Sequence, residues 1–211
     1  MLIYSHQDIL SFEKYFRISL LNKISGLKSA NLIATKSKND KSNVAIFNSV
    51  IHIGANPPYL GFIMRPTTVD RHTYDNIKNI GLFTINQVTA SIHQNAHLSA
   101  AKFPKDISEF DTCQLSEVYI DDFPIPFVKE SPIKIALSYQ EEHEIAVNNT
   151  RLIIGKVEKL ILPDDLIKKD GDIDFEIING ITIGGLDTYY TVKRLGRYAY
   201  AKPNQAIKKI V

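Results

Sequence analysis

Two apolar runs separated by a proline turn place the strongest constraint on how this chain can fold. The first run, Val44–Ile53, has the length of a buried strand. The turn Asn56–Pro58 follows it, and a second apolar run, Tyr59–Met64, ends at Arg65. Paired prolines between apolar runs mark a turn. The pattern therefore predicts two strands joined by that turn.

Polar residues within and after these runs predict a binding site. Asn48 and Ser49 interrupt the first strand, and buried polar groups without partners cost about 1–3 kcal/mol each. A helix is predicted over 70–80, with Asp70 as its N-cap and basic and hydroxyl residues in its first turn. Because helix N-termini favour anions, residues 43–76 fit a ligand with a polar ring edge and a phosphate.

The rest of the chain predicts a mainly β fold with a closed sheet. Lys36–Ser42 is a turn by composition, so the strands on either side form a hairpin. No G-x-G-x-x-G turn follows a strand, which argues against a dinucleotide-binding fold. Further strands are predicted at Ile18–Leu21, Ser29–Thr35, Leu82–Val88, Ile133–Tyr139 and Thr150–Leu162, and further helices at Ser11–Tyr15 and Ala90–Ala101.

Composition indicates an ordinary globular protein. The 211 residues favour a single domain, 1–211, and the net charge of +2 gives no reason to expect nucleic acid or an anionic membrane as a partner. The N-terminus lacks the apolar region of a signal peptide, and no window has the character of a transmembrane helix. Cys113 is the single cysteine, so no internal disulfide can form. We expect a cytoplasmic protein.

The order of short motifs resembles the flavin reductase-like family, whose fold is a six-stranded Greek-key FMN-binding split barrel. The motifs are T-x-S-x4-S-N-x-A-x-F-x-S-V-x6-P-P-x-L-G-F from Thr35 to Phe62, then R-P, H-T-Y-x-N-I and G-x-F-T-I-N. The later A-H-x-S-A, S-P-I-K and N-x-T-x-L-I-I-G motifs also fit. The resemblance implies a core of about residues 15–165, a C-terminal extension over 166–211, and a homodimer with FMN near its interface.

The resemblance also implies which residues contact FMN. Residues 43–50 would meet the isoalloxazine edge, and the segment from Arg65 to Thr73 would hold the phosphate, since arginine matches phosphate oxygens. The alternatives are capping of the barrel end and ordinary helix capping with solvated charge. The candidate FMN-binding residues are Asn43, Asn48, Ser49, Val50, Arg65, Thr67, Arg71, His72, Thr73, His97 and Ser99.

Other reactive residue types give weaker evidence for a functional site. His93 and His97 have the spacing of one metal-binding helix face, but no third ligand follows, so no metal site is predicted. Glu141–Glu144 is interpreted as a solvated loop, and Cys113 has no activating neighbour in the sequence. A basic group in the tail fits either the phosphates of a nicotinamide nucleotide or a solvated arm, and we favour the arm: Lys193, Arg194 and Arg197.

The resulting hypothesis is an oxidoreductase in which NAD(P)H passes a hydride to flavin N5 and the electrons go on to an unidentified acceptor. The cofactors carry this chemistry, so no catalytic side chain is predicted. An FMN-binding protein or electron carrier without reductase activity is the main alternative. A β-barrel interaction module without flavin is a third.

Overall fold

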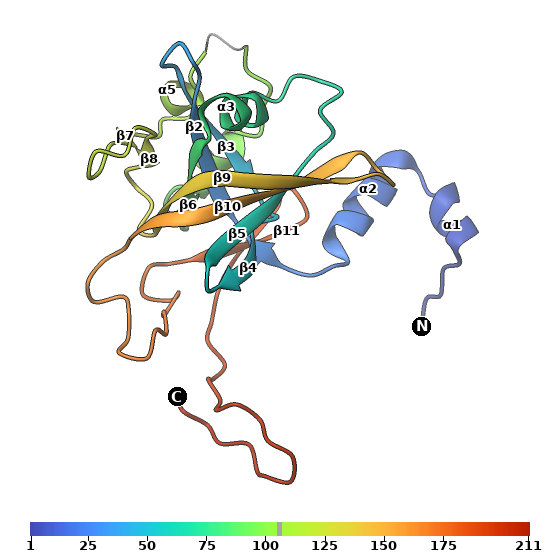
Figure 1. The fold of residues 1–211 in the computed structure, drawn as a ribbon. Helices are drawn as coiled ribbons and strands as arrows, with labels where there is room; N and C mark the ends of the chain where they lie inside the picture. Colours follow the sequence, from blue (N-terminus) through green and yellow to red (C-terminus); the bar gives the residue numbers. More distant parts are fainter. Residues whose placement is uncertain (105–106) are drawn as a thin grey trace.

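The computed structural model describes residues 1–104 and 107–211, and within them the fold is mainly β, as predicted. A seven-stranded antiparallel sheet has the order β3-β2-β6-β9-β10-β5-β4. The long β9–β10 pair crosses the middle of the molecule (Figure 1). These strands are β2 (Asn31–Lys36), β3 (Ser42–Phe47), β4 (Ile51–Ala55), β5 (Pro58–Met64), β6 (Leu82–Gln87), β9 (Lys134–Ile145) and β10 (Thr150–Ile161).

Smaller sheets and short helices surround this sheet. A three-stranded sheet has the order β1-β11-β12 and consists of β1 (Lys28–Ser29), β11 (Ile181–Gly184) and β12 (Thr188–Thr191). A third sheet pairs β7 (Glu117–Val118) with β8 (Phe127–Val128). The helices are α1 (His6–Ser11), α2 (Lys14–Lys23), α3 (His72–Ile80), α4 (His93–Leu98) and α5 (Glu109–Thr112).

The two edges of the large sheet are tied together by a very short link. β3 and β4 lie at opposite ends of the strand order, yet only residues 48–50 separate them in the chain. Because an extended chain spans at most about 3.6 Å per residue, the end of β3 and the start of β4 lie within about 14 Å. The sheet must therefore curl until its edges face each other. Because β4 pairs only with Pro58–Gly61, the end of β5 faces β3 across a seam.

Apolar side chains fill the inside of the curled sheet. Phe62 and Phe83 are fully buried and pack edge to face, with ring centroids 5.8 Å apart. Ile77 of α3 packs into the same cluster, so the helix is anchored over the sheet. Gly155 permits this packing, because a Cβ there would lie 2.6 Å from Cζ of Phe83. Gly81 ends α3 at φ 77°, as a helix C-terminal glycine commonly does.

The strand prediction for Ile18–Leu21 is wrong, because these residues lie inside α2. A run of four residues is too short for periodicity to separate strand from helix. The helix is stabilised at its start by the carboxylate of Glu13, which accepts from the backbone N–H groups of Tyr15 and Phe16 at 2.8 and 3.0 Å. That capping pattern was the signal in the sequence.

Three other boundaries also differ from the prediction. The run Val44–Ile53 is divided between β3 and β4 rather than forming one strand. Asp70 is not the N-cap of α3; the cap is Arg71, which makes no side-chain capping bond. The helix predicted over 90–101 is confined to His93–Leu98.

The interpretation of Glu141–Glu144 as a solvated loop is wrong, because these residues belong to β9. Glu142 accepts from Arg151 of β10 at 3.1 Å and from the hydroxyl of Tyr74 of α3 at 3.0 Å. Partners on other elements stabilise this acidic segment as a strand, and local composition does not reveal them.

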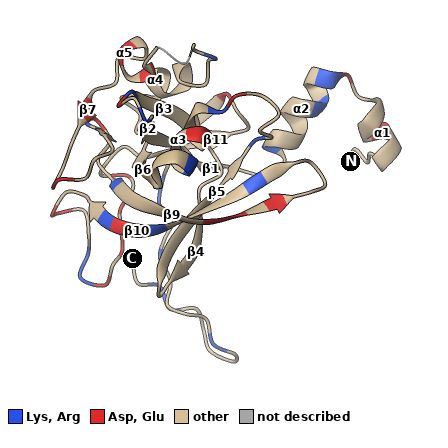
Figure 2. Cartoon of the chain, turned by 45° about the horizontal axis from the view of Figure 1, so that its top comes forward, with Lys and Arg blue, Asp and Glu red and all other residues tan. Residues whose placement is uncertain are grey.

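The two ends of the chain lead away from the sheet. Neither α1 nor α2 has a buried residue, and both helices and the C-terminal segment extend from the body (Figure 1). Part of the expected extension over 166–211 returns to the body, since Ile181 and Ile183 of β11 are buried in a hydrophobic cluster. Lysine, arginine, aspartate and glutamate are spread over many elements (Figure 2). None of the described helices is long and apolar enough to cross a membrane.

Replacing Gly155 by alanine tests the packing inside the sheet. The new Cβ would overlap the ring of Phe83, so we expect destabilisation of about 1–3 kcal/mol, as for other overpacked cores. Chemical denaturation measures this. The same substitution in a Phe83→Leu background should cost less, because the smaller side chain leaves room. Equal costs in the two backgrounds would contradict the close packing of these residues.

Candidate functional site

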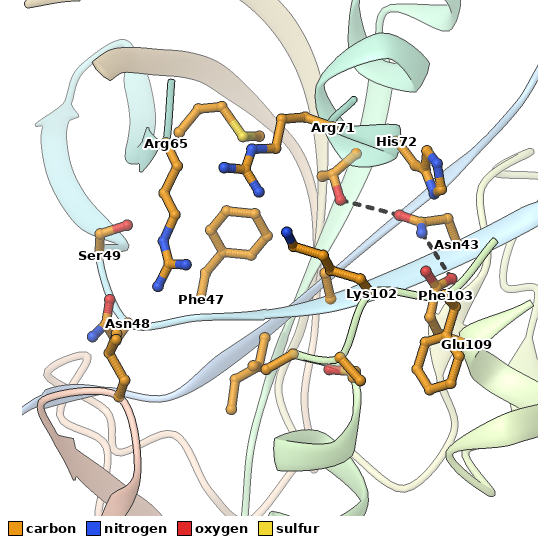
Figure 3. Close-up of a pocket in the computed structure, with 18 of the residues that line it drawn as sticks. Asn43, Phe47, Asn48, Ser49, Arg65, Arg71, His72, Lys102, Phe103 and Glu109 are labelled. Atoms are coloured by element: carbon orange, nitrogen blue, oxygen red, sulfur yellow. Dashed lines mark hydrogen bonds between the residues drawn. The ribbon is translucent and has the colours of Figure 1, made fainter. Parts of the chain in front are cut away.

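A cavity of about 610 Å³ opens at the seam of the sheet. It is lined by the end of β3, the link to β4, the end of β5, the start of α3 and the segment 99–104 after α4. Asn22 of α2 and Leu186 beside β11 complete its wall. Figure 3 shows the side chains that point into it. This volume lies in the usual range for small-molecule sites.

One wall holds a buried hydrogen-bond network centred on Asn43. Its Oδ1 accepts from the hydroxyls of Thr73 at 3.0 Å and Thr35 at 3.3 Å, and its Nδ2 donates to Oε2 of Glu109 at 2.7 Å. Asn76 donates to the hydroxyl of Thr35 at 3.0 Å. All five residues are buried. The network therefore joins β2, β3, α3 and α5 and fixes the first turn of α3 against the sheet.

Glu109 is a buried carboxyl on the cavity wall. Burial raises its pKa, while hydrogen bonds from its own backbone N–H, from Asn43 and from the Val44 N–H act in the opposite direction. The charge of His72 also opposes the increase in pKa. The site thus contains one carboxyl whose protonation is set by a balance between desolvation and hydrogen bonding.

The opposite side of the cavity is basic. The side chains of Arg65, Arg71 and Lys102 lie around the ring of Phe47 (Figure 3). Arg71 Nε donates to the carbonyl of Pro66 at 3.2 Å, which orients the guanidinium. Within residues 1–104 and 107–211, Arg65 and Lys102 have no hydrogen bond or ion pair. These cations and the free N–H groups at the start of α3 favour an anion.

The link between β3 and β4 supplies polar groups at the other end of the cavity. Ser49 Oγ donates to the Ile63 carbonyl at 3.2 Å and accepts from the Ile63 N–H at 3.1 Å. Asn48 Nδ2 donates to the Gly185 carbonyl at 2.7 Å. The chain leaves the strand at these two residues, and both of them line the cavity.

The structure brings most of the predicted site residues together. The following line the cavity: Asn43, Asn48, Ser49, Arg65, Arg71, His72, Thr73 and Ser99. The Ser99 hydroxyl already donates to the Ala96 carbonyl at 2.6 Å.

Val50, Thr67 and His97 are not among the residues that line the cavity. Val50 packs against the buried cluster around Phe62, so its side chain contributes to the hydrophobic core. Thr67 follows β5 in the turn before α3. His97 lies on the outer side of α4, where its Nδ1 is 3.0 Å from the hydroxyl of Tyr189.

Several cavity residues were missed from the sequence, among them Asn22, Lys102, Phe103, Glu109 and Leu186. A basic residue two positions after the A-H-x-S-A motif was an available signal for Lys102. Glu109 had none, because it lies in a stretch whose composition indicates an irregular acidic loop. Leu186 reaches the cavity through the β1-β11-β12 sheet, a pairing that local sequence does not reveal.

The histidine pair on α4 packs around Tyr189 of β12. Both rings meet the tyrosine ring edge to face, at 5.5 Å for His93 and 5.7 Å for His97. Burial raises the pKa of Tyr189 to about 12. Among the residues the structure describes, no group of three or more His, Cys, Asp or Glu is placed to hold a metal ion.

Cys113 is buried beside α5. Burial, with a contribution from the charge of Glu109, raises the pKa of its thiol to about 11. A thiolate is the reactive form of cysteine, so Cys113 is a poor nucleophile near neutral pH.

Comparison with known proteins decides the family. The model of the flavin reductase like domain family matches residues 26–174. The chain belongs to this family. A solved structure of a split barrel domain protein from Shewanella frigidimarina NCIMB 400, assigned as a flavin reductase, is 42% identical. It covers 95% of this chain and 100% of its own, with a TM-score of 0.92.

More distant proteins share the fold. Nitrilotriacetate monooxygenase component B from Bacillus cereus is 19% identical, with a TM-score of 0.80 and coverage of 93% of this chain and 98% of its own. An uncharacterized protein from Deinococcus radiodurans is 24% identical over 211 residues, covering 94% of this chain and 92% of the relative. The split-barrel prediction is confirmed by the likeness to the Shewanella frigidimarina structure.

Proposed function

We propose that this flavin reductase family member binds FMN in the seam cavity and works as an NAD(P)H-dependent oxidoreductase. The observation that carries the proposal is the polarity of the cavity. Arg71, Lys102 and the N-terminus of α3 lie toward one end, and the amide of Asn48 and the hydroxyl of Ser49 lie at the other, with Arg65 beside them (Figure 3). This donor set fits a ligand with a phosphate and a polar ring edge, as FMN has.

Each end of the cavity would have a separate binding role. Arg65, Arg71 and the first turn of α3 would hold the phosphate, with Lys102 adding charge, since arginine binds phosphate oxygens in a planar fork. Asn48 and Ser49 would meet the ring edge. Val50, Thr67 and His97 are left out because the structure places them elsewhere.

Phe47 offers an apolar surface between these two ends (Figure 3). Its ring packs edge to face on Phe62, with centroids 5.0 Å apart, so its orientation is fixed by the core. An aromatic ring held in this way suits packing against another aromatic ring system. FMN, when bound, supplies the hydride chemistry. The residues of this chain bind and orient it and shield it from water. No side-chain acid or base is assigned.

The proposal includes a cytoplasmic setting, and the electron acceptor stays open. The free thiol of Cys113 is consistent with a reducing compartment.

Absorbance of the purified protein tests the function directly. We expect FMN to bind and its visible absorbance to bleach anaerobically when NADH or NADPH is added. Bound FMN that dithionite bleaches, but neither nucleotide does, would favour an electron carrier. A protein that binds no FMN at saturating concentration would overturn the proposal.

Substituting Arg65 tests the phosphate end. Arg65 is exposed and makes no bond to the fold within the described residues, so Arg65→Ala should fold normally. A charge-assisted hydrogen bond contributes about 1.5–3 kcal/mol, which predicts FMN affinity lower by roughly 10- to 100-fold. Fluorescence titration measures this.

Riboflavin and a distant cation provide the controls for Arg65→Ala. Riboflavin lacks the phosphate, so its affinity should change much less. Lys193→Ala removes an exposed charge outside the cavity and should leave FMN binding unchanged. Equal loss of FMN and riboflavin affinity would remove Arg65 from the phosphate site.

We further propose a homodimer. The first 27 residues expose large apolar side chains: Leu2, Ile3, Leu10, Tyr15, Phe16, Ile18, Leu21, Ile24 and Leu27. Exposed apolar patches of this kind mark interaction surfaces. Since Asn22 of α2 lines the cavity, a second copy covering α2 would lie next to the flavin.

Sedimentation equilibrium tests the dimer. We expect the wild-type protein to be a dimer and the Phe16→Asp variant to be more monomeric, because the substitution places a charge in the interface. Leu160→Asp is the matched control, because the two side chains are similarly exposed, at 53% and 52%, and Leu160 lies on β10. A wild-type protein that sediments as a monomer would contradict the proposal.

A further inference from the structure

Asn43 forms a junction whose orientation depends on Glu109. An ionised carboxylate accepts hydrogen bonds and donates none. With Glu109 ionised, the Nδ2 group of Asn43 must therefore face Oε2 of Glu109, 2.7 Å away. Oδ1 of Asn43 then faces the hydroxyls of Thr73 and Thr35, which donate to it.

This orientation gives Thr73 the wrong polarity for a phosphate. A hydroxyl has one proton, and that of Thr73 is directed at Asn43 over 3.0 Å. Its oxygen then offers lone pairs only to the cavity that it lines. A phosphate dianion also accepts hydrogen bonds without donating any, so the two groups repel. The nearby charge of Glu109 adds to this repulsion.

A proton on Glu109 reverses the whole chain of bonds. The carboxyl can then donate to Oδ1 of Asn43 once the amide turns by half a rotation. Nδ2 of Asn43 would donate to the oxygens of Thr73 and Thr35, which have lone pairs to accept it. Thr73 becomes free to donate its proton into the cavity. Asn43, Thr73 and Glu109 are at most 7% exposed, so their hydrogen bonds to one another are strongly coupled.

We propose that Glu109 is a positioning residue that takes up a proton when an FMN phosphate binds at Thr73, with the amide of Asn43 passing the change between them. The inference rests on the proposed function, because it needs the phosphate at the start of α3. The proton comes from solvent and no covalent bond changes. By linkage, the phosphate favours protonated Glu109 as much as that proton favours the phosphate.

The charged groups around Glu109 set the pH range of this coupling. The charge of His72 on α3 lowers the pKa of Glu109, and Cys113 lies close enough for Glu109 to act on it. Asp70, Arg71 and Lys102 line the same cavity. Burial already raises the pKa of Glu109, and a bound anion raises it further. Proton uptake therefore occurs at pH values between the free and bound pKa and vanishes above both.

Proton uptake is measured by titration calorimetry of FMN binding in buffers that differ in ionisation enthalpy. Glu109→Gln is neutral at every pH and can satisfy either orientation of Asn43. We expect wild-type protein to take up more protons than Glu109→Gln at pH values between the free and bound pKa of Glu109, and a series of titrations at different pH locates this window. The titration of the FMN phosphate itself cancels in this comparison.

Affinity gives a second readout of the same coupling. As pH rises through the window, wild-type affinity for FMN should fall relative to that of Glu109→Gln, by at most tenfold per pH unit for one proton. Riboflavin should show no difference between the two proteins. Asp111→Asn removes an exposed charge from the same helix and should behave as wild type.

Equal proton uptake by wild type and Glu109→Gln would overturn the inference while leaving FMN binding intact. Failure of the wild-type protein to bind FMN would instead overturn the proposed function. If Glu109→Gln does not fold, Thr73→Val replaces it, because it removes the hydroxyl and keeps the Asn43–Glu109 bond. The inference then requires Thr73→Val to lose the extra proton uptake, and retention of that uptake would reject it.

Discussion

The short link between β3 and β4 is the constraint on which the rest of the structure depends. Three residues connect strands that lie at opposite edges of a seven-stranded sheet in the described chain. The sheet has to curl, and the link cannot continue the backbone ladder without interruption. The side chain of Ser49 takes over by bonding both backbone groups of Ile63. The Ser49 hydroxyl thus replaces backbone hydrogen bonds between the strands, and the seam with its cavity forms at that place.

Buried polar groups next to the seam must form hydrogen bonds with one another. The hydroxyls of Thr35 and Thr73, the amides of Asn43 and Asn76, and the carboxyl of Glu109 form a connected set. Partly satisfied networks of this kind are costly, which explains why α3 and α5 are held so closely to β2 and β3. The same network positions the start of α3 beside Arg65 and Arg71, so residues that stabilise the fold also shape the basic side of the cavity.

Local patterns in the sequence predicted the elements with strong periodicity or clear boundaries. The hairpin of β2 and β3, the strand β5, the first half of β9 and the strand β10 are examples. Motif order predicted the family. Two predictions of secondary structure were wrong. The segment Glu141–Glu144 is a strand because Arg151 and Tyr74, which are distant in sequence, bind Glu142. The residues Ile18–Leu21 belong to a helix that Glu13 caps.

The site was predictable to a similar degree and for similar reasons. Residues close together in the chain, such as Arg71, His72 and Thr73, were found because one helix start brings them together. Glu109 was not, because its role exists only through a bond to Asn43, 66 positions earlier. His97 was matched by motif, yet the packing of α4 turns it toward Tyr189.

The residues that line the cavity come from two parts of the chain, one inside and one outside the region that the family model matches. Asn43, Arg65 and Thr73 lie within residues 26–174, the part matched by the family. Asn22, Ile183 and Leu186 lie outside it, on α2 and around β11, where Asn48 binds Gly185 and Lys23 pairs with Asp187 at 3.0 Å. Changes in the terminal segments can thus alter access to the cavity while the Asn43 network and the cations opposite it stay in place.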